Sequence, residues 1–477
     1  MIRAFRANAR EHRASILVAA LSSAFGVALL ACTNVLGAYI AATDFGASTT
    51  AQIALSIVSG IFFVIAVYVG AIVTTNTFAT IIAGRTRTIA LLRLIGSSAH
   101  AQRRSVAGEG LTVGVIGAIA GGAGAAALSL LATRLLTATG VLPDVPYPVL
   151  TPSLLVPVVV VALTTWLASW IGSRRVLAVS PIQALGAAEE RPVAAIRSRA
   201  RIAVSLGLIV VGAALLLVGV LLGLRVFAGT PGLEGLGPYG VLVALPGGIL
   251  SFTGIVLAAP LFLPVVLRLA GLLLGRGAAS RLAAANATRN PERSSRTAIG
   301  LVIGVTLVTM FVVAAQSWLQ MIRDAAREQP EAYAGVENVL TVVMVVFSVL
   351  VGFSAIIAAV GVVNSLALSV LQRARELGLL RALGFTGGQV RRMILAESVQ
   401  ITVAGVVTGL LLGSVYGWAG AQSLLGGIPG GGFVIPVLPW AYLGLVAGAG
   451  ALLAVLASLA PTRRATRITP VAALAVE

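Results

Sequence analysis

Long apolar runs separated by short arginine-bearing segments dominate the chain. A membrane-spanning helix needs about 20 apolar residues, and ten runs reach that length. They cover residues 15–41, 53–83, 106–133, 151–172, 202–224, 240–275, 297–320, 339–371, 394–424 and 434–460. The sixth run contains Pro246, Pro260 and Pro264, which predicts a kinked or partly re-entrant segment. The pattern predicts an all-α integral membrane protein with about ten transmembrane helices.

The composition agrees with a location in the bilayer. Of the 477 residues, 58% are hydrophobic and 10% are charged, whereas soluble domains carry about 25% charged residues. The single cysteine, Cys32, excludes an internal disulfide. Cys32 has two interpretations. It is either a small residue buried in the first span or the end of a lipoprotein signal, since Leu29 to Cys32 reads LLAC.

The distribution of arginine predicts the orientation of the spans. All 33 basic residues are arginine, which is typical of a GC-rich bacterial genome, and 29 of them fall in alternate segments between the runs. Because arginine-rich loops stay on the cytoplasmic side, we expect a multi-pass protein of the bacterial plasma membrane with both termini in the cytoplasm. The net charge of +18 is then explained by this topology, which places most arginines beside anionic lipid headgroups. No nucleic-acid partner is expected.

Three motifs recur in the same order in the two halves of the chain. Without a gap, GRTRTIALLRLIGSSAHAQRRSVAGEG from Gly84 aligns with QRARELGLLRALGFTGGQVRRMILAES from Gln372. SRRVLAVSPIQAL from Ser173 aligns with TRRATRITPVAAL from Thr462, and a weaker pair joins RANAR from Arg6 to AANATR from Ala284. These pairs predict two parallel four-span units, 1–187 and 281–477. Two linking transmembrane helices then occupy residues 188–280.

The arginine-rich segment after the second span of each unit predicts a short amphipathic helix. In the second unit it lacks proline from Gln372 to Leu383, and Gly384 follows as a helix end. Arg373 and Glu376 can pair one turn apart. Two interpretations remain open: a helix that rests on lipid headgroups, or a docking surface for a soluble partner. The repetition favours docking, because two equivalent helices suit a symmetric dimer.

This region resembles the FtsX-like permease family, the membrane subunits of MacB-type (type VII) ABC transporters. RARELGLLRALGFTGGQVRRMILAESVQITVAGVVTGLLLG, from Arg373, carries the resemblance. In the first copy Thr88 stands in place of Glu376, and Ile95 replaces a leucine. The resemblance covers both halves and implies two FtsX-like repeats in a ten-span form. It also implies a permease that transmits conformational change through coupling helices.

The resemblance assigns roles to residues of both copies. Coupling helices that dock an ATPase would contain Arg373, Arg375, Glu376, Leu377, Leu380, Arg381, Leu383 and Gly384, and in the first copy Arg85, Arg87, Leu91, Leu92, Arg93 and Gly96. The implied partners are two ABC ATPase subunits per chain, which would hold ATP and Mg²⁺. Glu109 and Glu397 lie at the cytoplasmic mouths of the following spans. We expect each to contact a nearby arginine or the N-terminus of its own helix.

The chain departs from the family in its short links outside the membrane. Residues 42–52 and 321–338 leave no room for a folded extracytoplasmic domain, although the second link is expected to form one surface helix before Pro330. A hydrophobic, lipid-like or antimicrobial substrate taken from the bilayer fits this form, and an accessory protein could supply the missing domain. By resemblance, the faces of 15–41, 53–83, 297–320 and 339–371 are the candidate substrate contacts.

Several kinds of chemistry are absent from the sequence. A phosphate-binding ATPase loop needs lysine, and the chain has none, so we expect no enzyme activity and no cofactor bound by this chain. His12 and His100 lack neighbouring metal ligands, so no metal site is expected.

Two other functions remain as alternatives. One is a non-transporting regulator of an extracytoplasmic cell-wall enzyme. The other is a secondary transporter, although the sequence places no carboxylate at the membrane midplane. Helix packing accounts for the polar residues near the spans, which are Asn34, Asn76, Asn364 and Gln400.

Overall fold

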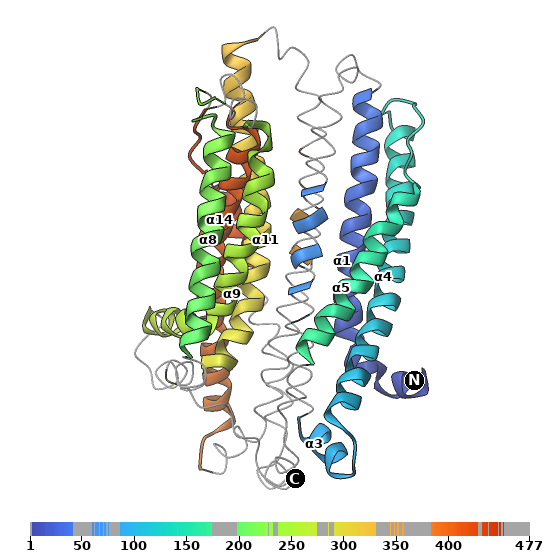
Figure 1. The fold of residues 1–477 in the computed structure, drawn as a ribbon, viewed down its shortest axis with the longest axis vertical. Helices are drawn as coiled ribbons and strands as arrows, with labels where there is room; N and C mark the ends of the chain where they lie inside the picture. Colours follow the sequence, from blue (N-terminus) through green and yellow to red (C-terminus); the bar gives the residue numbers. More distant parts are fainter. Residues whose placement is uncertain are drawn as a thin grey trace. The chain divides into compact units, whose positions relative to one another are not determined.

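The fold is known from a computed structural model, which contains helices and connecting turns but no strands in the residues that it describes (Figure 1). These are residues 2–41, 86–140, 142–173, 198–227, 229–231, 237–273, 291–330, 383–427, 432–436 and 438–446, with scattered positions in 60–75 and 344–356 and at 285, 448, 449 and 452. Within them, seven helices are long and apolar enough to cross a membrane. The expected all-α membrane fold is confirmed. The predicted spans at 53–83 and 339–371 lie largely outside the described residues, and the predicted span at 434–460 is described only in part, at 434–436, 438–446, 448, 449 and 452.

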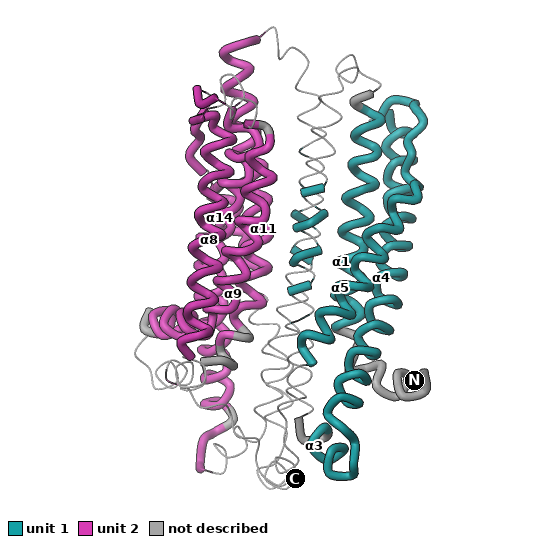
Figure 2. The backbone as a smooth tube through the Cα atoms, in the orientation of Figure 1, with its two compact units in different colours: residues 1–190, 335–360 teal, residues 191–334, 361–477 magenta. Residues whose placement is uncertain are grey.

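The chain forms two compact units, which Figure 2 colours separately. Unit 1 contains residues 1–190 and 335–360, and unit 2 contains residues 191–334 and 361–477. Unit 1 includes helices α1 (Ile2–Ala41), α3 (Thr86–Leu94), α4 (Ala99–Ala138) and α5 (Leu155–Gly172), with the 3-10 turn η2 (Pro152–Leu154) before α5. Unit 2 includes α8 (Arg199–Gly223), α9 (Gly240–Leu273), α11 (Pro291–Glu328) and α14 (Gly387–Leu425), with the turn η4 (Gly237–Tyr239) before α9.

Glycines on α4 allow α1 and α4 to pack closely and in parallel. A Cβ at Gly117 would lie 2.7 Å from the Cβ of Ala19, and one at Gly121 would overlap the carbonyl of Ala20. α5 runs in the opposite direction on another face of α4, where a Cβ at Gly114 would lie 2.9 Å from Thr165. Small residues let helix backbones approach in membranes, so these glycines explain the three-helix packing of unit 1.

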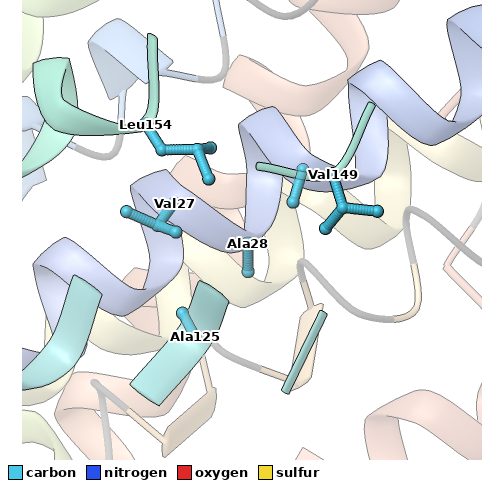
Figure 3. Packing of buried hydrophobic residues seen from close by; sticks show 6 residues of the cluster. Val27, Ala28, Ala125, Val149 and Leu154 are labelled. Carbon is cyan, nitrogen blue, oxygen red and sulfur yellow. The ribbon is translucent and has the colours of Figure 1, made fainter. Parts of the chain in front are cut away.

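A cluster of buried side chains joins α1, α4 and the connection before α5 in unit 1 (Figure 3). Val27 and Ala28 of α1 pack with Ala125 of α4, Leu154 of η2 and Val149 of the preceding loop. The Asn34 side-chain amide also donates to the hydroxyl of Thr151 at 3.0 Å. The α4–α5 connection therefore packs over the neighbouring α1, and Asn34 has the packing role that the sequence predicts.

The same construction recurs in unit 2, where α11 and α14 are parallel. Four glycines one turn apart line α14: Gly405, Gly409, Gly413 and Gly417. Cβ atoms at the first three would lie 2.5–2.6 Å from side chains of Leu301, Val305 and Thr309, respectively. This row of glycines thus faces successive turns of α11 and lets the two backbones approach closely.

The predicted linking helices, α8 and α9, form an antiparallel pair with glycines at seven-residue intervals. Gly219 faces Gly240, Gly212 faces Gly247, and Gly254 faces the carbonyl of Ser205. A Cβ at Gly219 or Gly240 would come within 2.6 Å of the opposite backbone. Larger side chains at these positions would separate the two helices.

The α8–α9 pair packs against α11 and α14 within unit 2. Gln400 of α14 donates its side-chain amide to the carbonyl oxygen of Leu267 of α9. The hydroxyls of Ser251 and Tyr416 lie 2.9 Å apart, and Ser295 of α11 donates to the carbonyl of Ala259 at 3.2 Å. The division into segments 1–187, 188–280 and 281–477 stays a prediction, because these contacts do not fix repeat boundaries.

Two local expectations need correction. α9 continues from Gly240 through Pro246, Pro260 and Pro264 as one helix, so the re-entrant alternative is wrong, while its last turns run across the direction of α8 (Figure 1). α11 continues without a break to Glu328, so no separate surface helix precedes Pro330. Met321 and Ala325 are fully buried in this extension, which explains why the helix persists beyond its apolar run.

Candidate functional site

The first predicted coupling helix is present as α3. This helix of nine residues contains Leu91, Leu92 and Arg93, while the backbone of Arg87 lies within it and Arg85 lies outside the described residues. Its end is a Schellman turn, in which the amide of Ser97 donates to the carbonyl of Leu92 and that of Gly96 to the carbonyl of Arg93. Gly96 has φ +102°, a conformation that disfavours other residues.

One face of α3 is buried and the opposite face is exposed. Ile89 and Ala90 are buried. Leu91, Leu94 and Ile95 are exposed, Ile95 to 81%. A short helix beside several arginines that exposes three large apolar side chains is suited to contact with another protein. The arrangement itself carries no chemical reaction.

The end of the second predicted coupling helix repeats this geometry. Leu383, at the position of Ile95, is 71% exposed, and Gly384, at the position of Gly96, has φ +96°. The other predicted docking residues of this copy, Arg373, Arg375, Glu376, Leu377, Leu380 and Arg381, lie outside the described residues.

The following helices begin at equivalent positions in the two copies. α4 begins at Ala99 and α14 at Gly387, which keeps the ungapped spacing of the sequence repeat. Ser98 caps α4 by accepting from the amide of Ala101. Thr386 caps α14 through a complete capping box with Gln389. We call the two predicted coupling helices with their terminal glycines, residues 85–96 and 373–384, the coupling segments. Each is joined by its left-handed glycine and a capped turn to a long helix of its own unit.

Glu109 and Glu397 lie farther inside their helices than we expected. Each is partly buried and follows the first residue of its helix by ten positions, about 15 Å along the axis. The interaction with a helix N-terminus is therefore wrong, because that effect is confined to the first turn. Contact with nearby arginines stays a prediction for both carboxylates.

Arg103 has a partner that the sequence did not suggest. Its guanidinium carbon lies 4.0 Å from the ring centre of Trp170, and its side chain donates to the carbonyl of Trp170 at 3.4 Å. This cation–π contact joins the start of α4 to the end of α5. Sequence reasoning also missed Leu94 and Ile95 as exposed apolar residues, although the alignment of Ile95 with Leu383 was a usable signal. Among the described residues, no group of three or more His, Cys, Asp or Glu could hold a metal.

The sequence of this chain is similar to those of known ABC transporter permeases. The chain is 30% identical over 150 residues to the uncharacterized ABC transporter permease YknZ of Bacillus subtilis (strain 168), which covers 31% of this chain and 35% of that protein. It is 30% identical over 154 residues to the macrolide export ATP-binding/permease protein MacB of Shewanella sp. (strain W3-18-1), 32% of this chain and 22% of MacB.

A third relative is the pyoverdine export ATP-binding/permease protein PvdT of Pseudomonas savastanoi pv. phaseolicola (strain 1448A / Race 6). The identity is 30% over 159 residues, which is 33% of this chain and 22% of PvdT. The matched segments thus span about a third or less of the length of these relatives.

The family comparison covers both halves of the chain. The family model described as FtsX-like permease C-terminal matches residues 60–181 and again residues 348–470, which together make up just over half of the sequence. Each match includes one coupling segment and the long helix that follows it, α3 with α4 in the first and α14 in the second. The chain is a multi-pass membrane protein that belongs to the FtsX-like permease family of ABC transporter permeases.

Proposed function

We propose that this chain is the permease subunit of an ABC transporter and works with a separate ATPase dimer. ATP and Mg²⁺ are held by the two ATPase subunits, which dock on the paired coupling segments at the arginine-rich ends of units 1 and 2. Closure of the ATPase dimer moves α4 and α14, and these helices transmit the movement across the bacterial plasma membrane. Both termini lie in the cytoplasm in this arrangement.

One observation carries the proposal: both coupling segments expose a large apolar residue directly before a left-handed glycine. These are Ile95 before Gly96 and Leu383 before Gly384. Apolar side chains at a polar, arginine-rich helix end are costly in water, at roughly 25 cal/mol per Å² of exposed apolar area. A partner protein that covers them removes that cost at two equivalent places.

The proposed substrate is hydrophobic, lipid-like or antimicrobial, and it is exported or extracted from the bilayer. The named substrates of MacB and PvdT, macrolide and pyoverdine, support export as the direction. The short links of the chain support capture within the membrane, and an extracytoplasmic accessory protein could complete the pathway.

A second candidate is the regulator of an extracytoplasmic enzyme, and the length of α11 favours it. This helix has 38 residues and is therefore about 57 Å long, whereas the hydrocarbon core is about 30 Å thick. Its last turns carry the exposed Arg327, which pairs with Asp324 at 3.1 Å. A charged helix end of this kind could contact a protein outside the membrane.

Coexpression and pull-down with a Walker-motif ATPase from a neighbouring gene tests the first candidate. We expect Ile95→Asp combined with Leu383→Asp to reduce the recovered ATPase at least tenfold, because each change places a carboxylate in an apolar contact. Leu380→Asp combined with Leu92→Asp tests the predicted docking faces in the same way. Leu150→Asp, at an exposed position of the α4–α5 loop, is the matched control and should leave recovery unchanged. Full recovery with the Ile95/Leu383 variant would refute the docking assignment.

A further inference from the structure

The end of α8 has an arginine where a glycine is the usual residue. The amide of Arg225 donates to the carbonyl of Leu222 at 2.9 Å, and the amide of Val226 donates to the carbonyl of Leu221 at 3.1 Å. This is the Schellman turn, with Arg225 in the left-handed position. Its φ is +54°, the only positive φ at a non-glycine residue in the part of the chain that the structure describes.

The two coupling segments show what the chain does elsewhere at this position. Gly96 and Gly384 occupy the left-handed residue there, where a Cβ would be strained. A positive charge near the C-terminus of a helix is favourable, but an arginine in the last turn of α8 would supply it with unstrained backbone. Helix termination therefore does not explain Arg225, and strained backbone of this kind is concentrated at functional positions.

The side chain of Arg225 runs between two glycines of different segments. A Cβ at Gly427, just after α14, would lie 2.8 Å from both Cγ and Nε of Arg225. A Cβ at Gly237, at the start of η4, would lie 3.1 Å from Cγ. Because neither glycine has a side chain, there is room between them for the aliphatic part of the Arg225 side chain, its stem. The residue as a whole is exposed, so the stem is held while the charged end reaches the surface.

The surroundings of Arg225 are those expected of a residue at the level of lipid headgroups. It follows α8, a candidate membrane span whose surface is mostly not covered by protein. Leu217 and Val218 in the last turns of α8 and Val226 after it are exposed apolar residues. Acyl chains can cover these side chains, and the headgroup of the same lipid would then lie beside the guanidinium. Among the described residues, Arg225 has no ion-pair partner.

We propose that Arg225 binds the phosphate of a membrane phospholipid at the end of α8, opposite the arginine-rich end of unit 2. The guanidinium donates two hydrogen bonds to phosphate oxygens, and the exposed face of α8 contacts the acyl chains. The site is separate from the coupling segments, so it can fail without affecting the proposed function.

The test uses the purified full-length chain in detergent, titrated with dioleoylphosphatidylglycerol and followed by native mass spectrometry. Arg225→Met keeps a stem between Gly237 and Gly427 but removes the charge, and we expect about tenfold weaker binding of the tightest lipid. Arg134→Met is the matched control, because Arg134 is exposed near the corresponding end of α4 in regular helix. This control should bind as the unchanged chain does. Dioleoylglycerol, which lacks the phosphate, should bind the unchanged chain as weakly as phosphatidylglycerol binds Arg225→Met.

A second variant separates binding from stability. Arg225→Gly relieves the left-handed strain, so its melting temperature should equal or exceed that of the unchanged chain while lipid affinity falls. Unchanged lipid affinity in Arg225→Met, or a lower melting temperature in Arg225→Gly, would overturn the proposal. Displacement of the lipid by millimolar inorganic phosphate would overturn the lipid as the source of the phosphate.

Discussion

α4 of unit 1 and α14 of unit 2 begin at equivalent repeat positions but face different surroundings. Both follow a left-handed glycine, and each packs in parallel on another helix of its unit through glycines, α4 on α1 and α14 on α11. α14 also contacts α9, through the Gln400 amide and the Tyr416 hydroxyl. At the aligned positions α4 carries Thr112, which bonds only within its own helix, and Leu128, which is 59% exposed.

This difference separates the contacts that both copies of the repeat share from the contacts that the predicted linking helices add in unit 2. Glycine contacts between the first and third spans occur in both copies, so they belong to the basic unit. Polar side chains appear on α14 where a neighbouring helix supplies partners, whereas α4 keeps apolar or self-bonded residues that suit lipid. In a membrane the hydrophobic effect does not favour contact with another helix over contact with lipid. Close backbone approach and hydrogen bonds therefore determine which helices pack together.

The largest effect is expected from filling the glycine contacts that the two copies share. Gly121→Leu should separate α4 from α1, and Gly413→Leu should separate α14 from α11, because both positions face the neighbouring helix closely. We expect each to lower the free energy of unfolding by roughly 3 kcal/mol, measured by denaturation of the purified protein in micelles.

Two other glycines provide controls on the same helices. A Cβ at Gly124 of α4 or Gly420 of α14 would meet nothing within 4 Å. Gly124→Leu and Gly420→Leu should therefore leave stability unchanged or slightly higher, since glycine is a poor helix former. If the buried and open positions respond equally, close packing is not what joins the helices.

A smaller effect should appear only in unit 2. Gln400→Leu removes the hydrogen bond to Leu267 and should cost about 1 kcal/mol of unfolding free energy. Thr112→Leu, the aligned change in unit 1, removes only bonds within α4 and should be close to neutral. An equal loss in both variants would show that the two copies do not differ as described.

The cation–π contact should give an effect of similar or smaller size, found only in unit 1. Trp170→Leu removes the ring that Arg103 covers and should cost about 0.5–1 kcal/mol. Trp166→Leu, a change of the same type on α5 at a position of similar exposure, should cost less. Thermal unfolding followed by near-ultraviolet circular dichroism measures both variants.

The helix caps should give the smallest effect, and it should be larger in the second copy. Thr386→Ala breaks a capping box in which Thr386 and Gln389 each accept from the other's backbone amide, whereas Ser98→Ala removes one cap bond. We expect losses of about 1 and 0.5 kcal/mol, respectively. Hydrogen exchange at the first turns of α14 and α4 reports on each cap separately. A larger rise in exchange rate at α4 in Ser98→Ala than at α14 in Thr386→Ala would contradict the expected order.

The sequence predicted the parts of this fold that depend on local patterns. Seven of the apolar runs correspond to spans that the structure describes. Gly96 follows the end of α3, and both Gly96 and Gly384 have the left-handed backbone that favours glycine. Packing roles for Asn34 and Gln400 are confirmed. The partner of Gln400 is 133 residues away, so no local pattern could identify it.

Other features escaped prediction for the same physical reason. α11 extends beyond its apolar run because Met321 packs with Ala421 and Val434, which is a tertiary contact. The weakest motif pair also differs from the packing register. Its two segments begin at Arg6 and Ala284, 278 residues apart, whereas Ala20 and Val305, which Gly121 and Gly409 face, are 285 residues apart. Contacts between helices, and not motif spacing, define which positions of α1 and α11 are equivalent.

The central claim is that two equivalent coupling segments engage two subunits of one ATPase. Because Cys32 is the single cysteine, Ile95→Cys and Leu383→Cys can be placed singly and together in a Cys32→Ala background. A bifunctional maleimide reagent then joins each thiol to a single cysteine placed on the surface of each ATPase subunit. We predict one crosslinked ATPase subunit per chain for each single variant and two for the pair, resolved by mass. A single ATPase subunit in the paired variant, or none at either position, would contradict the account.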